Sequence, residues 1–167
     1  QEALPPRIMD ELKPTRLFRT PAGEAVLDFG QNMVGFVRFH VKGNAGDHVV
    51  LRHAEVLDRD GNFYTANLKG AKQTIEYILK GGGEELYQPS FTFQGFRYVC
   101  IDSYPGKIEP ENFTGCVVHS QMKQSGSFAC SNELVNQLQH NILWGQKGNF
   151  VDVPTDCPQR DERHGWT

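Results

Sequence analysis

The sequence predicts a mainly β fold, an antiparallel β-sandwich followed by one α-helix and an irregular C-terminal loop. Three observations support this fold class. Short runs with alternating apolar and polar residues fill the chain up to about residue 130, turns rich in Gly, Asp and Asn separate them, and the apolar period then lengthens to between three and four residues. Consecutive short strands without intervening helices are typical of sandwiches and barrels.

The clearest strand signal lies in residues 34–41, where Val37, Phe39 and Val41 alternate with Arg38 and His40. Such alternation is expected of a sheet with one buried and one solvated face. The other runs end at turn sequences such as Gly-Asn-Ala-Gly and Asp-Arg-Asp-Gly. The strands we expect are residues 24–29, 34–41, 48–56, 73–79, 91–101, 115–120 and 126–130.

A helix is predicted for residues 131–146, because Leu134, Val135, Leu138, Ile142 and Leu143 recur at helical spacing. Ser131 is a suitable N-cap, and Glu133 lies in the first turn, where the helix dipole favours a negative charge. This apolar stripe could dock on the sandwich, stay exposed or pack against a second copy of the chain, so we expect a dimer through helix 131–146 as one arrangement.

The domain organisation follows from these changes of pattern. Residues 1–14 are rich in proline and charge without a clear period, so we interpret them as an N-terminal arm or the remnant of a preceding domain. Residues 15–122 form the predicted sandwich, and residues 123–167 begin a second unit. The sequence starts without Met and ends within a loop, so we expect it to be part of a longer protein.

Composition excludes several classes of protein. There are 17 Lys and Arg against 20 Asp and Glu, and without a basic block a nucleic-acid partner is not expected. No apolar run is long enough to cross a bilayer, so no membrane partner is expected either. The four cysteines are widely spaced and the six histidines dispersed, which favours reduced thiols and argues against a metal or other cofactor. The compartment is not indicated.

Two conspicuous segments are interpreted as structural. The aromatic residues within 91–98 could form a sugar-stacking platform, but core packing is favoured because Phe91, Phe93 and Phe96 lack a polar group. Residues 28–35 begin with the letters of a kinase motif, but no glycine-rich loop accompanies them. We therefore expect a turn whose polar side chains bind backbone groups.

The C-terminal loop, residues 153–167, is the candidate site. Carboxylates, arginines, a histidine and a tryptophan lie close together between rigid prolines, a composition suited to gripping a polyhydroxylated ring. Asp156, Asp161 and Glu162 lie near two arginines, an arrangement that could keep one acid protonated and another ionised, as glycosidic cleavage requires. A structural network of ion pairs would have the same composition.

Four blocks of this sequence resemble the bacterial α-L-rhamnosidases, which hydrolyse terminal α-L-rhamnose with inversion. The blocks are DFGQNMVG at 28–35, LRHAEVLD at 51–58, FTFQGFRYV at 91–99 and VPTDCPQRDER at 153–163. The resemblance covers nearly everything from Val26 onward. It implies that the sandwich is concanavalin-like, of the jelly-roll type, and that the last block opens an (α/α)6 catalytic barrel.

The resemblance also implies roles for residues of the loop. Glu162 matches the general acid, Asp156 and Arg160 match residues that bind rhamnose hydroxyls, and Trp166 matches a wall of the pocket. The partner is then a rhamnose-containing glycoside or oligosaccharide. The general base has no counterpart in this sequence, so we expect the isolated chain to be inactive and its loop to have no pocket.

Two other hypotheses remain open. The sandwich could be a carbohydrate-binding module without catalysis, which an exposed aromatic patch with polar neighbours would favour. It could also be a purely structural domain whose surface is covered by the rest of a longer protein.

Overall fold

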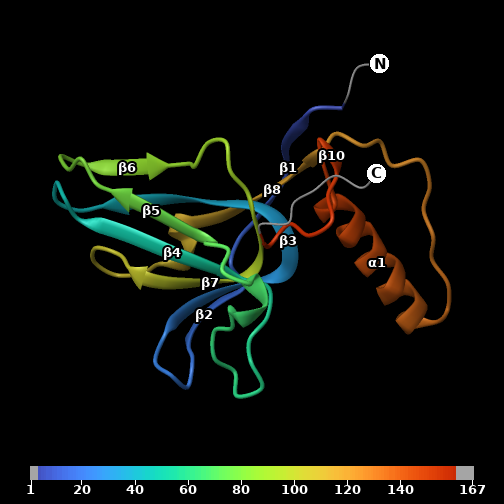
Figure 1. Ribbon diagram of the computed structural model, residues 1–167, viewed down its shortest axis with the longest axis horizontal. Coiled ribbons are helices and arrows are strands. Elements are labelled where there is room, and N and C mark those ends of the chain that lie inside the picture. The colour runs from blue at the N-terminus through green and yellow to red at the C-terminus, as the bar shows by residue number, and fades with distance from the viewer. Residues whose placement is uncertain (1–3, 161–167) are drawn as a thin grey trace.

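The structure is a computed structural model that describes residues 4–160 (Figure 1). Within that range it contains a curled antiparallel sheet, one α-helix beside it and a small C-terminal hairpin. The strands are β1 (Pro6–Leu12), β2 (Arg16–Arg19), β3 (Ala25–Lys42), β4 (His48–Ala54), β5 (Thr74–Ile78), β6 (Glu84–Tyr87), β7 (Gln94–Ser103), β8 (Phe113–Ser120), β9 (Phe150–Val151) and β10 (Val153–Pro154). The helix is α1 (Glu133–Gly148), and two 3-10 turns span Ala66–Leu68 and Pro110–Asn112.

The long strand β3 organises the sheet. The strand order is β1-β8-β3-β7-β4-β5, and β2 and β6 also pair with β3. The first part of β3 pairs with β2 and β7, whereas its last residues pair with β6 and β8. The register against β7 shifts between Asp28 and Met33, which marks a bulge. Bulges bend a strand, and this one separates the two halves that were predicted as strands 24–29 and 34–41.

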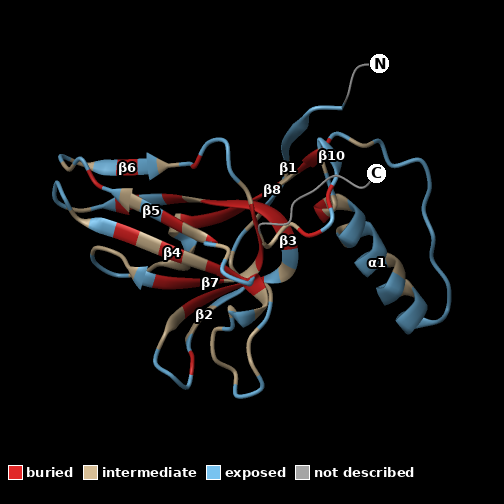
Figure 2. Cartoon of the chain, in the orientation of Figure 1, coloured by how far each residue is buried: buried red, intermediate tan, exposed pale blue. Residues whose placement is uncertain are grey.

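The core lies inside the curl of the sheet (Figure 2). Phe39 is fully buried and contacts the rings of Tyr77, Tyr87 and Phe113, with centroids 5.4–6.2 Å apart. Aromatic groups at this spacing pack edge-on or tilted and stabilise a core beyond their buried area. The predicted sandwich class is confirmed by this antiparallel curled sheet followed by one helix.

Several predicted boundaries change. Residues 126–130, predicted as a strand, form none and are exposed, since they have no neighbouring strand to pair with. The helix begins two residues later than predicted. Its N-cap is Asn132 rather than Ser131, because the Asn132 side chain accepts hydrogen bonds from the amides of Leu134 (3.0 Å) and Val135 (3.4 Å).

The aromatic segment 91–98 is divided between surface and core. Phe96 is fully buried, in agreement with core packing, but the interpretation was wrong for Phe91, which is fully exposed and has a φ of 58°. Strand β7 accordingly begins at Gln94 and not at residue 91. A non-glycine residue with positive φ is typical of a turn, so Phe91 lies before the strand.

Residues 6–12 lie in the segment predicted as an N-terminal arm, and they pair with β8 as the edge strand β1. Both faces of β1 are largely exposed, so its sequence shows no apolar alternation. The short strands β2 and β6 were also not predicted. Each pairs with β3, and contact with that strand rather than their own pattern defines them.

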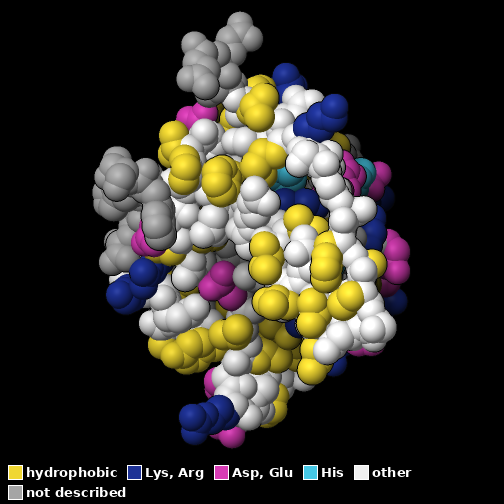
Figure 3. All heavy atoms as spheres, turned by 90° about the vertical axis from the view of Figure 1, so that its right-hand side faces the viewer, with side chains coloured by type: hydrophobic (Ala, Val, Ile, Leu, Met, Phe, Trp, Pro, Cys, Tyr) yellow, Lys and Arg dark blue, Asp and Glu magenta, His cyan; other side chains and the backbone are white. Residues whose placement is uncertain are grey.

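The apolar stripe of α1 faces away from the sandwich. Leu134, Leu138 and Ile142 are 81%, 57% and 54% exposed. Figure 3 views the side on which α1 lies, and hydrophobic side chains gather there. Only the C-terminal end of the helix packs closely on the sheet, where Gly148 is buried and a Cβ on it would lie 3.1 Å from Val34 Cγ2.

Candidate functional site

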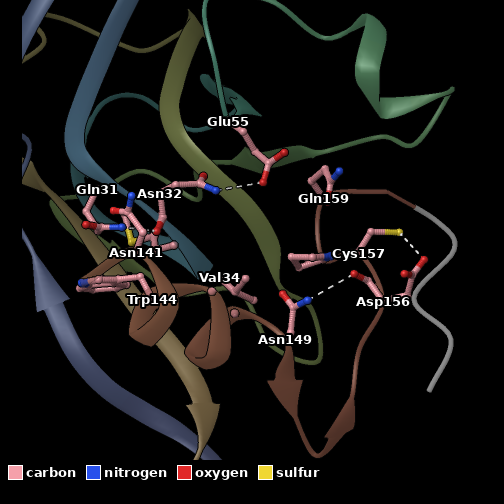
Figure 4. A pocket seen from close by; sticks show the side chains of 14 residues that line it. Gln31, Asn32, Val34, Glu55, Asn141, Trp144, Asn149, Asp156, Cys157 and Gln159 are labelled. Atoms are coloured by element: carbon pink, nitrogen blue, oxygen red, sulfur yellow. Dashed lines mark hydrogen bonds between the residues drawn. The ribbon is translucent and has the colours of Figure 1, made fainter. Parts of the chain in front are cut away.

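A cleft of about 430 Å³ lies between the β3 bulge, the C-terminal half of α1 and the loop that follows the helix (Figure 4). This volume is within the range of roughly 300–1,000 Å³ that small-molecule sites occupy. Three parts of the chain contribute its polar lining. They are the sandwich with Gln31, Asn32 and Glu55, the helix with Asn141, and the loop with Asn149, Asp156 and Gln159.

The sandwich wall depends on the buried carboxylate of Asp28, which stabilises the β3 bulge. Its Oδ1 accepts hydrogen bonds from the amide of Gly30 (2.7 Å) and from Arg97 Nε (2.8 Å), and its Oδ2 accepts from Arg97 Nη2 (3.0 Å). Burial raises the pKa of Asp28, but the hydrogen bonds and charge of Arg97 and the Gly30 amide outweigh burial and hold that pKa below its usual range. Gly30 has a φ of 76°, which glycine adopts without strain.

The predicted turn at residues 28–35 is therefore a bulge within a strand, and its polar side chain does bind a backbone group. The bulge directs Gln31 and Asn32 to the cleft. Asn32 Nδ2 donates to Glu55 Oε1 (3.0 Å), which joins β3 to the segment after β4. Gln31 Oε1 lies 3.0 Å from His140 Nε2, a contact between the sandwich and α1.

The helix wall is held by contacts on both sides of Trp144. This side chain is half-buried and packs against the hydrophobic core. Lys147 Nζ lies 4.4 Å above its ring and forms an ion pair with Asp10 of β1 at 2.9 Å. A cation over an indole ring is favourable, so Lys147 links the helix to the edge strand.

The loop wall is attached to both the helix and the sandwich. Thr155 is buried, and its amide donates to the carbonyl of Asn149 at 2.7 Å. The amide of Asp152 donates to Ser120 Oγ at 2.9 Å. The backbone of Gln159 lies so near Gly95 that a Cβ on Gly95 would be 3.0 Å from its amide nitrogen. Residues 156–159 therefore line a cleft, which corrects the expectation that the loop has no pocket.

Cys157 connects the two described candidate sugar-binding residues. Its thiol donates to Asp156 Oδ2 at 3.4 Å, and its sulfur accepts from Arg160 Nε at 3.0 Å. Burial raises the pKa of the Cys157 thiol, so it remains a neutral donor near pH 7. Asp156 and Arg160 are thus brought together through one side chain.

The other two candidates, Glu162 and Trp166, lie outside the described residues. The site residues that sequence reasoning missed are Asn32 and Glu55 of the sandwich. Both fall inside the blocks that carry the family resemblance, but those blocks were assigned to structure. No pattern within one strand indicates that a bulge and a distant loop line the same cleft.

Residues 4–160 hold no group of three or more His, Cys, Asp or Glu side chains placed to bind a metal ion. No helix within the same residues is long and apolar enough to cross a membrane.

Comparisons with known proteins agree with this architecture. Residues 18–119 match the family model of the bacterial alpha-L-rhamnosidase concanavalin-like domain, and residues 123–167 match that of the bacterial alpha-L-rhamnosidase 6 hairpin glycosidase domain. An alpha-L-rhamnosidase of Streptomyces avermitilis is 52% identical over 163 residues, which are 98% of this chain and 16% of the relative.

Solved structures show the same relationship. The structure of the alpha-L-rhamnosidase from Dictyoglumus thermophilum superposes with a TM-score of 0.94 at 44% identity and covers 99% of this chain. The S. avermitilis alpha-L-rhamnosidase complexed with L-rhamnose superposes with a TM-score of 0.92 over 98% of this chain. The chain spans 19% and 16% of these two proteins. Because the family model of the sandwich domain matches most of this chain, the chain belongs to the family of bacterial α-L-rhamnosidases.

Proposed function

We propose that the whole protein is an α-L-rhamnosidase that releases terminal α-L-rhamnose from glycosides or oligosaccharides. The observation that carries this proposal is the juxtaposition of Asp156 and Arg160 through Cys157 beside a polar cleft. A carboxylate and a guanidinium supply acceptors and donors for adjacent sugar hydroxyls. Family membership and the L-rhamnose complex of the S. avermitilis enzyme support rhamnose as the sugar.

The proposed roles within the loop follow from this assignment. Glu162 protonates the leaving glycosidic oxygen, Asp156 and Arg160 hydrogen-bond the rhamnose hydroxyls, and Trp166 forms a wall of the pocket. Inversion requires a second carboxylate roughly 6.5–9.5 Å from the acid, which activates the attacking water. The whole protein would supply this base from outside the 167 residues. In this proposal residues 15–122 form the sandwich, and residues 123–167 belong to the catalytic domain.

The direct test is hydrolysis of an aryl α-L-rhamnoside by the whole protein, with product configuration followed by NMR. We expect release of β-L-rhamnose first, because inversion changes the anomeric configuration. Glu162→Gln should lower kcat about 100- to 10,000-fold, the usual contribution of a general acid. Glu133→Gln, at the start of α1, is the matched control and should retain activity. Unchanged kcat in Glu162→Gln would refute the role of Glu162.

The carbohydrate-binding module is less well supported as an alternative. In the described part of the sandwich, Tyr64 and Phe91 are the exposed aromatic side chains, at 37% and 109%. The polar cleft instead lies between the sandwich, the helix and the loop. Such a shared site suits a catalytic domain that uses the sandwich as one wall better than a module that binds sugar alone.

The dimer through helix 131–146 remains a proposal. The exposed Leu134, Leu138 and Ile142 form an apolar face that would be more stable when covered. Sedimentation of the whole protein and of its Leu138→Lys variant is the test. A dimer that dissociates in the variant supports this contact, and a monomeric whole protein excludes it.

A further inference from the structure

Most of the polar side chains that line the cleft have no part in the rhamnose binding proposed for Asp156 and Arg160. Five of its side chains are carboxamides and two are carboxylates, whereas none of the described lining residues is lysine or arginine. Carboxamides both donate and accept hydrogen bonds, as sugar hydroxyls do, and the absence of cations disfavours anionic ligands. The cleft therefore suits an uncharged polyhydroxylated group.

The sandwich side of the cleft offers a fixed acceptor. Asn32 Nδ2 donates to Glu55 Oε1 at 3.0 Å, and no residue among 4–160 is hydrogen-bonded to Oε2 of this carboxylate. A carboxylate accepts several hydrogen bonds, so Glu55 can accept one from Asn32 and another from a ligand hydroxyl. In Figure 4 the side chains of Glu55 and Asn32 meet on the side of the cleft opposite Asn149 and Asp156.

The two facing walls of the cleft come from different parts of the chain. Asp156 lies on the loop wall, where the proposed function puts the terminal rhamnose. Asn32 and Glu55 come from the sandwich instead. A volume of about 430 Å³ is in the range of sites for ligands larger than one small ring. The remaining space is thus available to the group that the rhamnose is attached to.

Hydrogen bonds at Asp28 support this wall. Asp28 Oδ1 accepts from the amide of Gly30 at 2.7 Å and from Arg97 Nε at 2.8 Å, which anchors the start of the bulge that bears Gln31 and Asn32. Gln31 is in turn joined to His140 of α1. Binding groups on a fixed backbone lose less conformational entropy when they bind a ligand.

We propose that Asn32 and Glu55 bind hydroxyl groups of the sugar that adjoins the terminal rhamnose, so that the sandwich contributes to recognition of the leaving group. This inference rests on the proposed rhamnosidase function. Glu55 accepts a hydroxyl hydrogen bond, and Asn32 orients that carboxylate through its bond to Oε1 while its own side-chain carbonyl oxygen is a second acceptor.

The test compares two substrates of the whole protein that differ only in the leaving group. One is methyl α-L-rhamnoside, whose methyl group carries no hydroxyl that could reach the sandwich. The other is a disaccharide of L-rhamnose α-linked to D-glucose. We expect Glu55→Gln and Asn32→Ala to lower kcat/KM for the disaccharide about 10-fold or more, as for loss of a hydrogen bond to a charged group, mainly through KM. The kcat/KM for methyl α-L-rhamnoside should stay within twofold.

Retained activity on methyl α-L-rhamnoside shows that a variant is folded, and Glu76→Gln on β5, an exposed site outside the cleft, should change neither value. Equal losses on both substrates, or no loss on either, would overturn the inference while leaving the rhamnosidase function intact. Failure of the proposed function is seen separately, as no hydrolysis of either substrate by the unmodified protein, and the inference then falls with it.

Discussion

Asp28 is a buried carboxylate whose partners come from different parts of the chain. Its side chain is 4% exposed and is bound by Arg97 from β7, by the Gly30 amide within the bulge and, at 3.5 Å, by Arg16 from β2. A buried charge is tolerated only when it is paired and hydrogen-bonded. One side chain therefore ties together the bulge that bears Gln31 and Asn32 and the strands on either side of it.

Replacement of Asp28 by Asn should lower the free energy of unfolding by about 2–3 kcal/mol at pH 7, because Arg97 loses its charged partner. Urea unfolding followed by fluorescence measures this change. Asp60→Asn, on an exposed turn, is the control and should change the value by less than about 0.5 kcal/mol. A loss in Asp28→Asn no larger than in the control would mean that the ion pair does not stabilise the bulge.

His53 is a second buried titratable side chain, but unlike Asp28 it is uncharged in the folded state near pH 7. It is 0% exposed, its Nδ1 lies 2.8 Å from the carbonyl oxygen of Gln73, and its ring lies 4.8 Å from that of Phe96. Burial lowers the pKa of His53 to about 4, although the hydrogen bond to Gln73 acts in the opposite direction. The ring is therefore neutral near pH 7 and donates from Nδ1.

Stability should accordingly decrease in mild acid. The pKa in the folded state is about 4 and the ordinary value is 6.5, so the unfolded chain binds a proton first as the pH falls. The contribution of the neutral ring is fully present above pH 6.5 and is lost between pH 6.5 and 4. This loss amounts to about 3 kcal/mol at about 1.4 kcal/mol per pKa unit.

Urea unfolding at several pH values between 7 and 4.5 measures the slope, which is the change in the free energy of unfolding with pH. The stability of His53→Leu should depend less on pH than that of the unmodified chain, whereas Ser131→Ala, at an exposed position without a titratable group, should keep the same pH dependence. Equal slopes in the His53→Leu variant and the unmodified chain would show that other groups control acid stability.

At the scale of elements, α1 shows how capping rather than periodicity sets a boundary. The apolar stripe correctly predicted a helix, but Ser131 and Asn132 are both good caps, and the stripe does not distinguish them. In the structure Asn132 accepts from two amides of the first turn, while Asn136 binds the backbone of Cys130. These local hydrogen bonds place the N-cap at Asn132 and not at the predicted Ser131.

Asn132→Ala should therefore destabilise the start of α1 by about 1 kcal/mol, which is close to a fivefold loss of protection for its first amides. Amide hydrogen exchange measures this protection. Ser131→Ala should leave it unchanged, and Asn132→Ser should restore most of it. The assignment would be refuted if Ser131→Ala had the larger effect.

The strands that the sequence did not predict were missed for a common reason. Strand β1 is an exposed edge strand that pairs with the distant β8, β6 pairs with the distant β3, and β2 is a four-residue strand paired with the neighbouring β3. Residues 126–130 are the reverse case, since they resemble a strand but have no partner. Pairing partners are not visible in a local pattern, and this explains both kinds of error.

At the scale of the whole molecule, the chain combines a complete sheet with a helix whose apolar side is exposed. The hydrophobic core is closed by β-strands, whereas Leu134, Leu138 and Ile142 of α1 contribute little to it. The chain spans 16% of the S. avermitilis relative. Its fold should therefore be stable by itself, but its proposed site needs further groups.

The 167-residue chain alone should give no detectable hydrolysis of an aryl α-L-rhamnoside, because the proposed mechanism needs a base that these residues do not supply. Release of the aryl group, measured against the same amount of whole protein, is the test. Circular dichroism with a β-rich spectrum confirms that the isolated chain is folded. Hydrolysis by the isolated chain at a rate near that of the whole protein would contradict the proposed division of the site.

The sequence by itself determined the fold class, the helix and the family, because alternation, helical spacing and four motif blocks are local properties of the chain. It also identified Asp156 and Arg160 as candidates. Only the tertiary structure decided that the bulge of β3, Glu55 and the C-terminal loop line one cleft, and that Cys157 joins the two candidates. The reason is physical: a cleft is formed by segments more than a hundred residues apart, and their approach depends on strand pairing and packing that no local pattern contains.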